Sequence, residues 1–204
     1  MIQISSLSLS YGEKMVLDHF SLSLPGEGVT VLSGPSGCGK TTLMRCIAGL
    51  EHPSSGTISG IAPQNTAFLF QEDRLFPWRT AEQHLWDVLP ASRREEAEHW
   101  LTLAGLEGER TAYPSSLSGG MRRRLALVRA LALGGALYLL DEPFTGVDGP
   151  RIESLMTFLR GLGTPVLLSS HEALVRSLAD QVIFLDGPPL CVHSSPSDPA
   201  APPG

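Results

Sequence analysis

A single segment near the N-terminus restricts the fold of this chain more than any other. Eight residues match the pattern G-x-x-x-x-G-K-[ST], after a compact apolar stretch (29–33) and before a stretch of helical composition (40–48). Its glycines let the backbone curl until consecutive N–H groups point inward at phosphate oxygens, and the N-terminus of the following helix attracts negative charge. The sequence therefore predicts a phosphate-binding strand, loop and helix. The loop consists of Gly34, Pro35, Ser36, Gly37, Cys38, Gly39, Lys40 and Thr41.

The last residues of this loop carry the charge and the hydroxyl that a nucleoside triphosphate needs. Lys40 is placed to reach the β and γ phosphates, and Thr41 offers its hydroxyl to Mg²⁺. Thr42, the next residue, completes the predicted nucleotide-binding set. A glycine-rich turn with an accidental lysine is the alternative, but the flanking strand and helix favour a phosphate site.

A pair of carboxylates follows an apolar run much later in the chain. Asp141 and Glu142 end the segment Leu137-Tyr-Leu-Leu-Asp-Glu142, and Pro143 comes next. A strand there places Asp141 at the carboxyl edge of a parallel sheet, beside the phosphate loop, where it can hold Mg²⁺. Glu142 can then accept the proton of the attacking water. The alternative, a charge pair at a helix N-terminus, is common in α/β proteins.

The other apolar runs predict an α/β fold. Residues 2–9 and 16–24 alternate apolar and polar side chains, which is typical of half-buried antiparallel strands. Short apolar runs separated by helical stretches favour a mostly parallel sheet covered by helices. These runs lie at 29–33, 67–70, 137–140, 166–169 and 182–185.

Residues 72–116 are charged and helical in composition, and we interpret them as a small helical subdomain. Helices are predicted at 81–89 and 93–104. Another is predicted from Ser118, a good N-cap, to Leu133, because apolar residues recur there at helical spacing. The fold class predicted is a P-loop NTPase core with a mostly parallel sheet, an N-terminal antiparallel β-region and this helical subdomain.

Length and composition predict a single domain over residues 1–194. The chain has 204 residues, of which 42% are hydrophobic. Proline, serine and alanine dominate residues 195–204, so we expect a disordered tail there. Neither a membrane-spanning segment nor a secretory signal is recognisable, so a cytoplasmic location is expected. Three cysteines are too few and too irregularly spaced for a disulfide framework or a zinc site.

Charge argues against nucleic acid as a partner. The formal net charge is −6, and a basic surface would be needed to hold a phosphate backbone. The only basic run is Arg122-Arg-Arg124, which we interpret as a solvated helix face.

One further motif resembles a specific family. Leu117-Ser-Gly-Gly-Met121, between the phosphate loop and the carboxylate pair, is similar to the signature of the nucleotide-binding subunits of ATP-binding-cassette (ABC) transporters. The resemblance implies ATP and Mg²⁺ as cofactors and two cassettes paired head to tail, from two copies or from a paralogous subunit. Ser118, Gly119 and Gly120 of one cassette would then contact the γ phosphate held by the other. Met121 departs from the family's glutamine, which leaves the backbone anion site but removes a side-chain hydrogen bond.

The same resemblance assigns roles to single residues elsewhere. Gln71 matches the glutamine that touches Mg²⁺ and the attacking water, and His171 matches the histidine that contacts the γ phosphate. Tyr11 matches the aromatic residue that stacks on adenine. Asp148 matches the aspartate of the loop between subunits, within Thr145-Gly-Val-Asp148, where the family more often has Ala-Leu.

Residues 70–80 resemble the ATPase subunits of bacterial importers for nitrate, sulfonate and taurine. This implies permease subunits in the membrane, a solute-binding protein as an indirect partner, and a peripheral position on the inner membrane face. Leu75, Phe76 and Trp78 are either an anchor for the permease or part of the core, and the sequence leaves both open. An exporter's ATPase subunit remains an alternative. A P-loop kinase or another soluble ATPase would leave the 117–121 motif and His171 unused.

Overall fold

The N-terminal β-region forms a separate antiparallel sheet in the computed structural model, which describes residues 1–193. The predicted disordered tail (195–204) lies outside the described residues. Strands β1 (Ile2–Tyr11) and β2 (Lys14–Leu24) form a hairpin whose turn contains Gly12 at φ 59°. β1 also pairs with β4 (Ser55–Ser59). β4 was not predicted, because its residues are mostly exposed and polar and show no apolar alternation.

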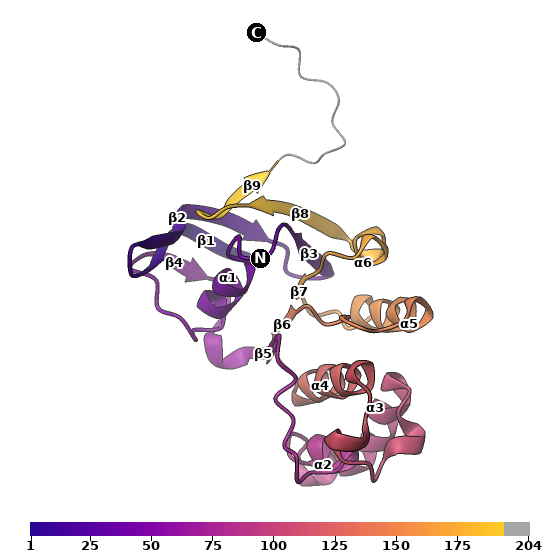
Figure 1. The fold of residues 1–204 in the computed structure, drawn as a ribbon. Coiled ribbons are helices and arrows are strands. Elements are labelled where there is room, and N and C mark those ends of the chain that lie inside the picture. The colour runs from indigo at the N-terminus through magenta and orange to yellow at the C-terminus, as the bar shows by residue number, and fades with distance from the viewer. Residues whose placement is uncertain (194–204) are drawn as a thin grey trace.

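The main sheet has six strands in the order β5-β6-β7-β3-β8-β9 (Figure 1). The first five are parallel, and β9 pairs antiparallel with β8. The predicted α/β class with a mostly parallel sheet is therefore confirmed. The strands are β3 (Val29–Ser33), β5 (Thr66–Leu69), β6 (Leu137–Asp141), β7 (Val166–Ser169), β8 (Gln181–Asp186) and β9 (Cys191–His193).

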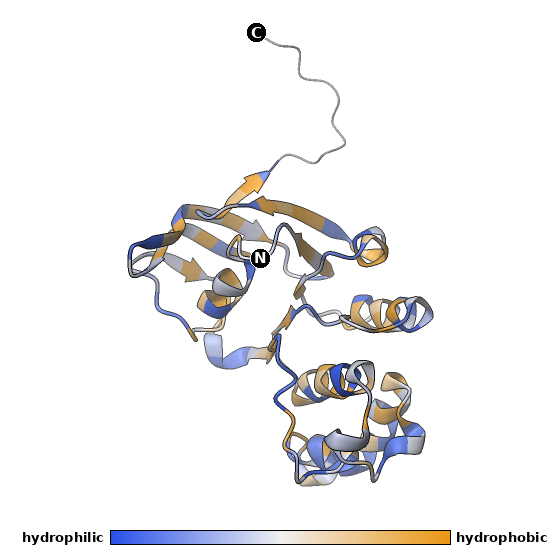
Figure 2. Ribbon diagram, in the orientation of Figure 1, coloured by the Kyte–Doolittle hydropathy of each residue, from blue (hydrophilic) through white to orange (hydrophobic). Residues whose placement is uncertain are grey.

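Both faces of the main sheet are covered, which explains why its central strands are uninterrupted apolar runs. β6 shows this directly. Leu137 and Leu139 pack with the antiparallel sheet and α1 (Lys40–Ile47) on one face, whereas Tyr138 and Leu140 pack with helices on the other. Figure 2 shows hydrophobic residues along these strands. On the second face lie α4 (Gly119–Leu133), α5 (Gly149–Arg160) and α6 (Ala173–Leu178).

Helices α2 (Ala81–Trp86), α3 (Ala97–Ala104) and α4 pack against one another beside the main sheet (Figure 1). The predicted boundaries at 81–89 and 93–104 were inexact. α2 is shorter than predicted: it ends at Trp86, and Pro90 disfavours helical backbone only at Leu89. Residues Ala91–Glu96 form a 3₁₀ helix that precedes α3. Shorter 3₁₀ turns occupy Pro63–Asn65, Glu107–Glu109 and Pro114–Ser116.

Across residues 1–193, the structure contains no helix that combines the length and the apolar character needed to cross a bilayer.

Candidate nucleotide site

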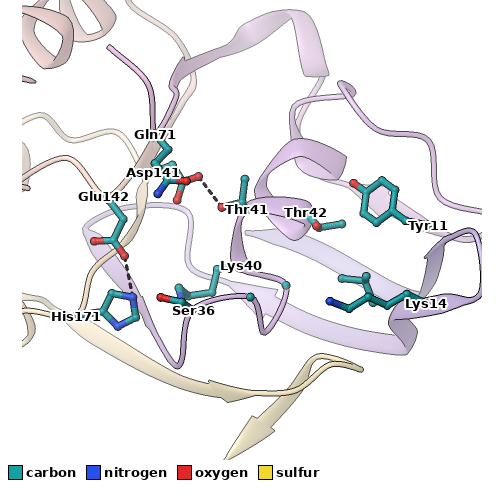
Figure 3. A pocket seen from close by; sticks show the side chains of 13 residues that line it. Tyr11, Lys14, Ser36, Lys40, Thr41, Thr42, Gln71, Asp141, Glu142 and His171 are labelled. Atoms are coloured by element: carbon teal, nitrogen blue, oxygen red, sulfur yellow. Dashed lines mark hydrogen bonds and ion pairs between the residues drawn. The ribbon is translucent and has the colours of Figure 1, made fainter. Parts of the chain in front are cut away.

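The predicted phosphate loop and carboxylate pair line one cavity of about 310 Å³. It lies where the parallel strands β3, β5, β6 and β7 end, the edge of an α/β sheet at which ligands bind. Tyr11 and Lys14 lie at one end of it, and Glu142 and His171 at the other (Figure 3). The predicted residues that line it are Tyr11, Ser36, Gly37, Gly39, Lys40, Thr41, Thr42, Gln71, Asp141, Glu142 and His171.

The phosphate loop needs its glycines for two different reasons. Gly37 and Gly39 have φ values of 80° and 123°, which other residues rarely adopt. Gly34 has no room for a side chain, because a Cβ there would overlap the carbonyl oxygen of Leu185. These constraints fix the curl that presents the loop's N–H groups to an anion.

Lys40 lies inside the loop rather than pointing into solvent. Its side chain is 7% exposed, and its Nζ donates hydrogen bonds to the carbonyl oxygens of Gly34 (2.7 Å) and Pro35 (2.9 Å). The sulfur of the buried Cys38 is 3.9 Å from the same nitrogen. Gly34, Pro35 and Cys38 thus contact the lysine or support the loop, while the other loop residues face the cavity.

Asp141 is held by two hydroxyl groups. Thr41 donates to its Oδ2 at 2.6 Å, and Ser169 donates to its Oδ1 at 2.7 Å. Hydroxyl, carboxylate and amide oxygens, the last from Gln71, are the hard ligands that Mg²⁺ prefers. Within residues 1–193, no group of three or more His, Cys, Asp or Glu side chains could hold a metal alone. The oxygens of Thr41, Asp141 and Gln71 therefore suit Mg²⁺, which takes its remaining ligands from phosphates and water.

Glu142 has an unusual backbone conformation, with φ at 50°. This left-handed conformation costs a residue other than glycine about 1–3 kcal/mol, so it persists only where surrounding contacts offset that cost. Its N–H donates to Ser169 Oγ at 2.9 Å, and its carboxylate is 3.1 Å from the Nε2 of His171. Burial raises the pKa of Glu142, Asp141 raises it further, and the charges of His171 and Lys40 partly oppose this. A carboxylate with a raised pKa is a stronger proton acceptor.

Two cavity residues were missed by the sequence analysis, Lys14 and Val16. Both belong to β2, directly after the turn that follows Tyr11. Tyr11 is 46% exposed at the cavity rim, and partial burial raises its pKa. The hairpin register was the available signal, since residues just across a turn from Tyr11 must lie beside it.

The signature segment does not reach this cavity. Gly119 and Gly120 line a separate hollow of about 380 Å³, together with Gln71 and Gly146. Ser118 caps α4 by accepting a hydrogen bond from the N–H of Met121 at 3.2 Å. A Cβ at Gly120 would overlap the carbonyl oxygen of Gly146, so glycine is needed for this close approach.

Asp148, which the resemblance places in the loop between subunits, is the N-cap of α5. Its Oδ1 accepts a hydrogen bond from the N–H of Arg151 at 3.1 Å. Such caps typically stabilise a helix by about 1 kcal/mol.

The interpretation of Arg122-Arg-Arg124 as a solvated helix face was wrong. Arg123 is only 4% exposed, and Arg124 has 14% of its side chain exposed. The spacing held the missed signal, because position 123 lies on the same helical face as the buried Leu127 and Ala130.

The strand, curled loop and helix, with a Mg²⁺-suited carboxylate at the end of β6 in the same sheet, define a P-loop nucleotide-binding domain. The family model described as ABC transporter matches residues 17–145. The chain belongs to the ABC transporter family, as its signature motif predicted.

Relatives named as import ATP-binding proteins cover most of the chain. The aliphatic sulfonates import ATP-binding protein SsuB 2 of Streptomyces avermitilis is 38% identical, over 91% of this chain and 76% of its own length. The sulfate/thiosulfate import ATP-binding protein CysA of Mycobacterium tuberculosis is 35% identical over 97% of this chain. The chain spans only 64% of the length of that relative.

The fold also matches a solved cassette. The dimeric structure of MJ0796, a bacterial ABC transporter cassette, aligns with a TM-score of 0.78 and 25% identity, covering 90% of this chain and 94% of that one. The predicted P-loop fold is thereby confirmed.

Proposed function

We propose that this chain binds ATP with Mg²⁺ and hydrolyses it to drive a membrane transporter. The observation that carries the proposal is the convergence of Lys40, Thr41, Asp141 and Glu142 on one cavity. Each supplies a different requirement of phosphoryl transfer: charge, metal ligands and a proton acceptor.

The residues divide the chemistry among them. The loop N–H groups and Lys40 bind the β and γ phosphates, while Thr41, Asp141 and Gln71 would hold Mg²⁺. When bound, Mg²⁺ neutralises charge that develops on the phosphates. Glu142 accepts the proton of the attacking water, helped by the raised pKa of its carboxylate. His171, next to Glu142, contacts the γ phosphate.

The base end of the nucleotide would lie along the first hairpin. Tyr11 offers an aromatic face at the cavity rim, and the aliphatic Val16 lines the same region. Thr42, in the first turn of α1, lines the same cavity. This arrangement leaves the phosphates at the end that contains Lys40 and Glu142.

A second cassette would complete the site. Gly119 and Gly120 line a hollow separate from the phosphate-loop cavity, and Ser118 directly precedes them, so one chain cannot apply both sites to one nucleotide. Head-to-tail pairing, with another copy or a paralogue, would bring them to the partner's γ phosphate. The dimeric form of the similar cassette supports this.

Import of a small oxyanion such as an organic sulfonate fits the names of the relatives, which are import ATP-binding proteins for aliphatic sulfonates and for sulfate or thiosulfate. The chain would act on the cytoplasmic face of the membrane, bound to permease subunits that receive solute from a binding protein. Phe76 and Trp78, 45% and 68% exposed, offer an anchor for those permeases.

Two substitutions test the catalytic assignment. Glu142→Gln is expected to bind ATP but lose about 100-fold or more of its turnover, because a positioned proton acceptor is gone. Lys40→Ala is expected to weaken ATP binding itself, since that charge contacts phosphate before reaction. Phosphate release and binding of a fluorescent ATP analogue measure the two effects. Wild-type turnover in Glu142→Gln would remove Glu142 from this role.

A further inference from the structure

The buried guanidinium of Arg123 contacts the backbone of two separate parts of the candidate site. Its Nε donates to the carbonyl oxygen of Glu142 at 3.0 Å, and its Nη2 donates to that of Asp141. Its Nη1 donates to the carbonyl oxygens of Phe70 (2.8 Å) and Gln71 (3.1 Å). One side chain from α4 therefore joins the end of β5 to the end of β6.

These contacts explain how Glu142 keeps its left-handed backbone. On its N–H side, Glu142 is fixed by Ser169. On its carbonyl side, Arg123 is the nearer donor, with Thr145 Oγ1 at 3.3 Å as a second one. Because the peptide units on both sides of Glu142 are hydrogen-bonded, its backbone is kept from a commoner conformation and the carboxylate stays directed at the cavity.

The shape of the guanidinium matters as much as its charge. Its planar fork presents fixed N–H directions, and here they meet carbonyl oxygens from both segments at once. Asp73 adds a carboxylate oxygen 3.2 Å from Nη1, which offsets the cost of burying the charge. A lysine at this position has a single nitrogen and cannot span both segments.

We infer that Arg123 is a positioning residue for ATP hydrolysis, which sets Glu142 and Gln71 in one fixed relation. The inference rests on the proposed function. Arg123 lines the second hollow rather than the nucleotide cavity, and its hydrogen bonds to Glu142 and Gln71 go to their backbone carbonyl oxygens.

Arg123→Lys tests this, with Arg129→Lys as a matched control. Arg129 lies on the same helix and donates to the carbonyl oxygens of Asp73 and Arg74 at 3.0 and 2.9 Å. These hydrogen bonds of Arg129 do not involve Glu142 or Asp141. Arg123→Lys is expected to lower kcat about 10- to 100-fold with KM for ATP nearly unchanged. Arg129→Lys is expected to lower only the melting midpoint.

A second measurement separates positioning from loss of structure. In a Glu142→Gln background, Arg123→Lys is expected to cause little further loss of the residual rate, because the group it positions is already absent. Independent, multiplying losses would overturn the inference, as would a wild-type kcat in Arg123→Lys. Failure of the wild-type chain to hydrolyse ATP would instead count against the proposed function.

A milder variant covers the case in which Arg123→Lys does not fold. Asp73→Asn removes the carboxylate that offsets the buried charge of Arg123, so it is expected to loosen the guanidinium and to lower the melting midpoint. It is expected to lower kcat several-fold with KM for ATP nearly unchanged, because a loosened Arg123 no longer holds Glu142 and Gln71 firmly. An unchanged kcat in a folded Asp73→Asn protein would then overturn the inference.

Discussion

At the scale of single residues, the balance of charge around Glu142 matters most. Burial and Asp141 favour its neutral form, whereas His171 and Lys40 favour its ionised form. The net result is a pKa above the usual range for glutamate. The charge state of this one carboxylate therefore sets the pH at which the proposed proton acceptor becomes available.

We predict that kcat falls on the acid side of its pH profile (the acid limb) at a pH above the ordinary pKa of a glutamate. Activity is lost as pH falls through the pKa of Glu142, because the protonated carboxyl cannot accept a proton, and a raised pKa moves that loss to higher pH. His171→Ala is expected to move the limb higher still, since a charge that lowers this pKa is removed.

The control for this pH profile is His19→Ala. His19 is exposed on β2 and pairs with Asp18, so its removal is expected to leave the limb in place. A limb that moves to lower pH in His171→Ala would contradict the assignment.

Motif chemistry could be predicted at this scale because residue types at fixed spacing determine it. The phosphate loop, Asp141 and Glu142 were predicted in this way, and they line one cavity. The burial of Arg123 was not predicted, because the interpretation rested on the polarity of three consecutive arginines and not on the helical spacing of Arg123 from the apolar Leu127 and Ala130. The left-handed backbone of Glu142 also gives no signal in the sequence, since it depends on partners from β7 and α4.

At the scale of elements, α2 fixes the segment that follows β5. His84 of α2 is fully buried, and its Nε2 accepts a hydrogen bond from the N–H of Phe76 at 2.9 Å. Its Nδ1 lies 2.8 Å from the carbonyl oxygen of Thr80, which requires the tautomer protonated at Nδ1. Burial lowers the pKa of His84, which favours this neutral form. The exposed rings of Phe76 and Trp78 stack on each other, with 5.6 Å between their centroids.

We predict that Phe76→Ala combined with Trp78→Ala leaves the melting midpoint and basal ATPase activity nearly unchanged. The two rings are exposed, so their removal creates no cavity in the core. Co-purification with the permease and solute-stimulated hydrolysis are expected to be lost, because the anchor is gone. A pull-down beside a thermal melt measures both.

Trp100→Ala is the matched control for that double variant. Trp100 is 8% exposed and packs edge-on against Phe158, so its loss is expected to cost about 3–5 kcal/mol. A similar drop in the Phe76/Trp78 variant, or full permease binding by it, would contradict the docking role.

The elements that could be predicted are those with an internal pattern. Buried parallel strands show as apolar runs and the first hairpin as an alternation. β4 and β9 have no such pattern, because they are short edge strands defined by the strands they pair with. The start of α3 depended on a 3₁₀ turn, which periodicity does not resolve.

At the scale of the whole molecule, the two hollows bear on the proposed head-to-tail pairing. The phosphate-loop cavity and the hollow at Gly119 and Gly120 are separate, and Gln71 lines both. The resemblance to the family predicted the residues of both hollows, and the composite site that they would form between two cassettes stays a prediction. The sequence could not predict how the two hollows are arranged on one chain, which depends on the packing of α4 against the main sheet.

We predict ATP-driven dimerisation. Glu142→Gln is expected to run as a dimer in light scattering with ATP and Mg²⁺, because nucleotide that is not hydrolysed stays bound between two copies. Without nucleotide it is expected to be monomeric. Lys40→Ala with ATP, as the control, is expected to remain monomeric. A Glu142→Gln protein that stays monomeric at saturating ATP would count against the head-to-tail arrangement.

The position of β3 has a consequence for how this protein is made. β3 leads directly into the phosphate loop, yet both of its neighbours come from much later in the chain: Val29 pairs with Val166, and Thr30 pairs with Gln181. On a ribosome, the N-terminal hairpin can form early from local contacts, but β3 waits for β7 and β8 to emerge. A nascent chain therefore acquires its nucleotide pocket among the last features to form, and an incomplete one cannot compete for ATP.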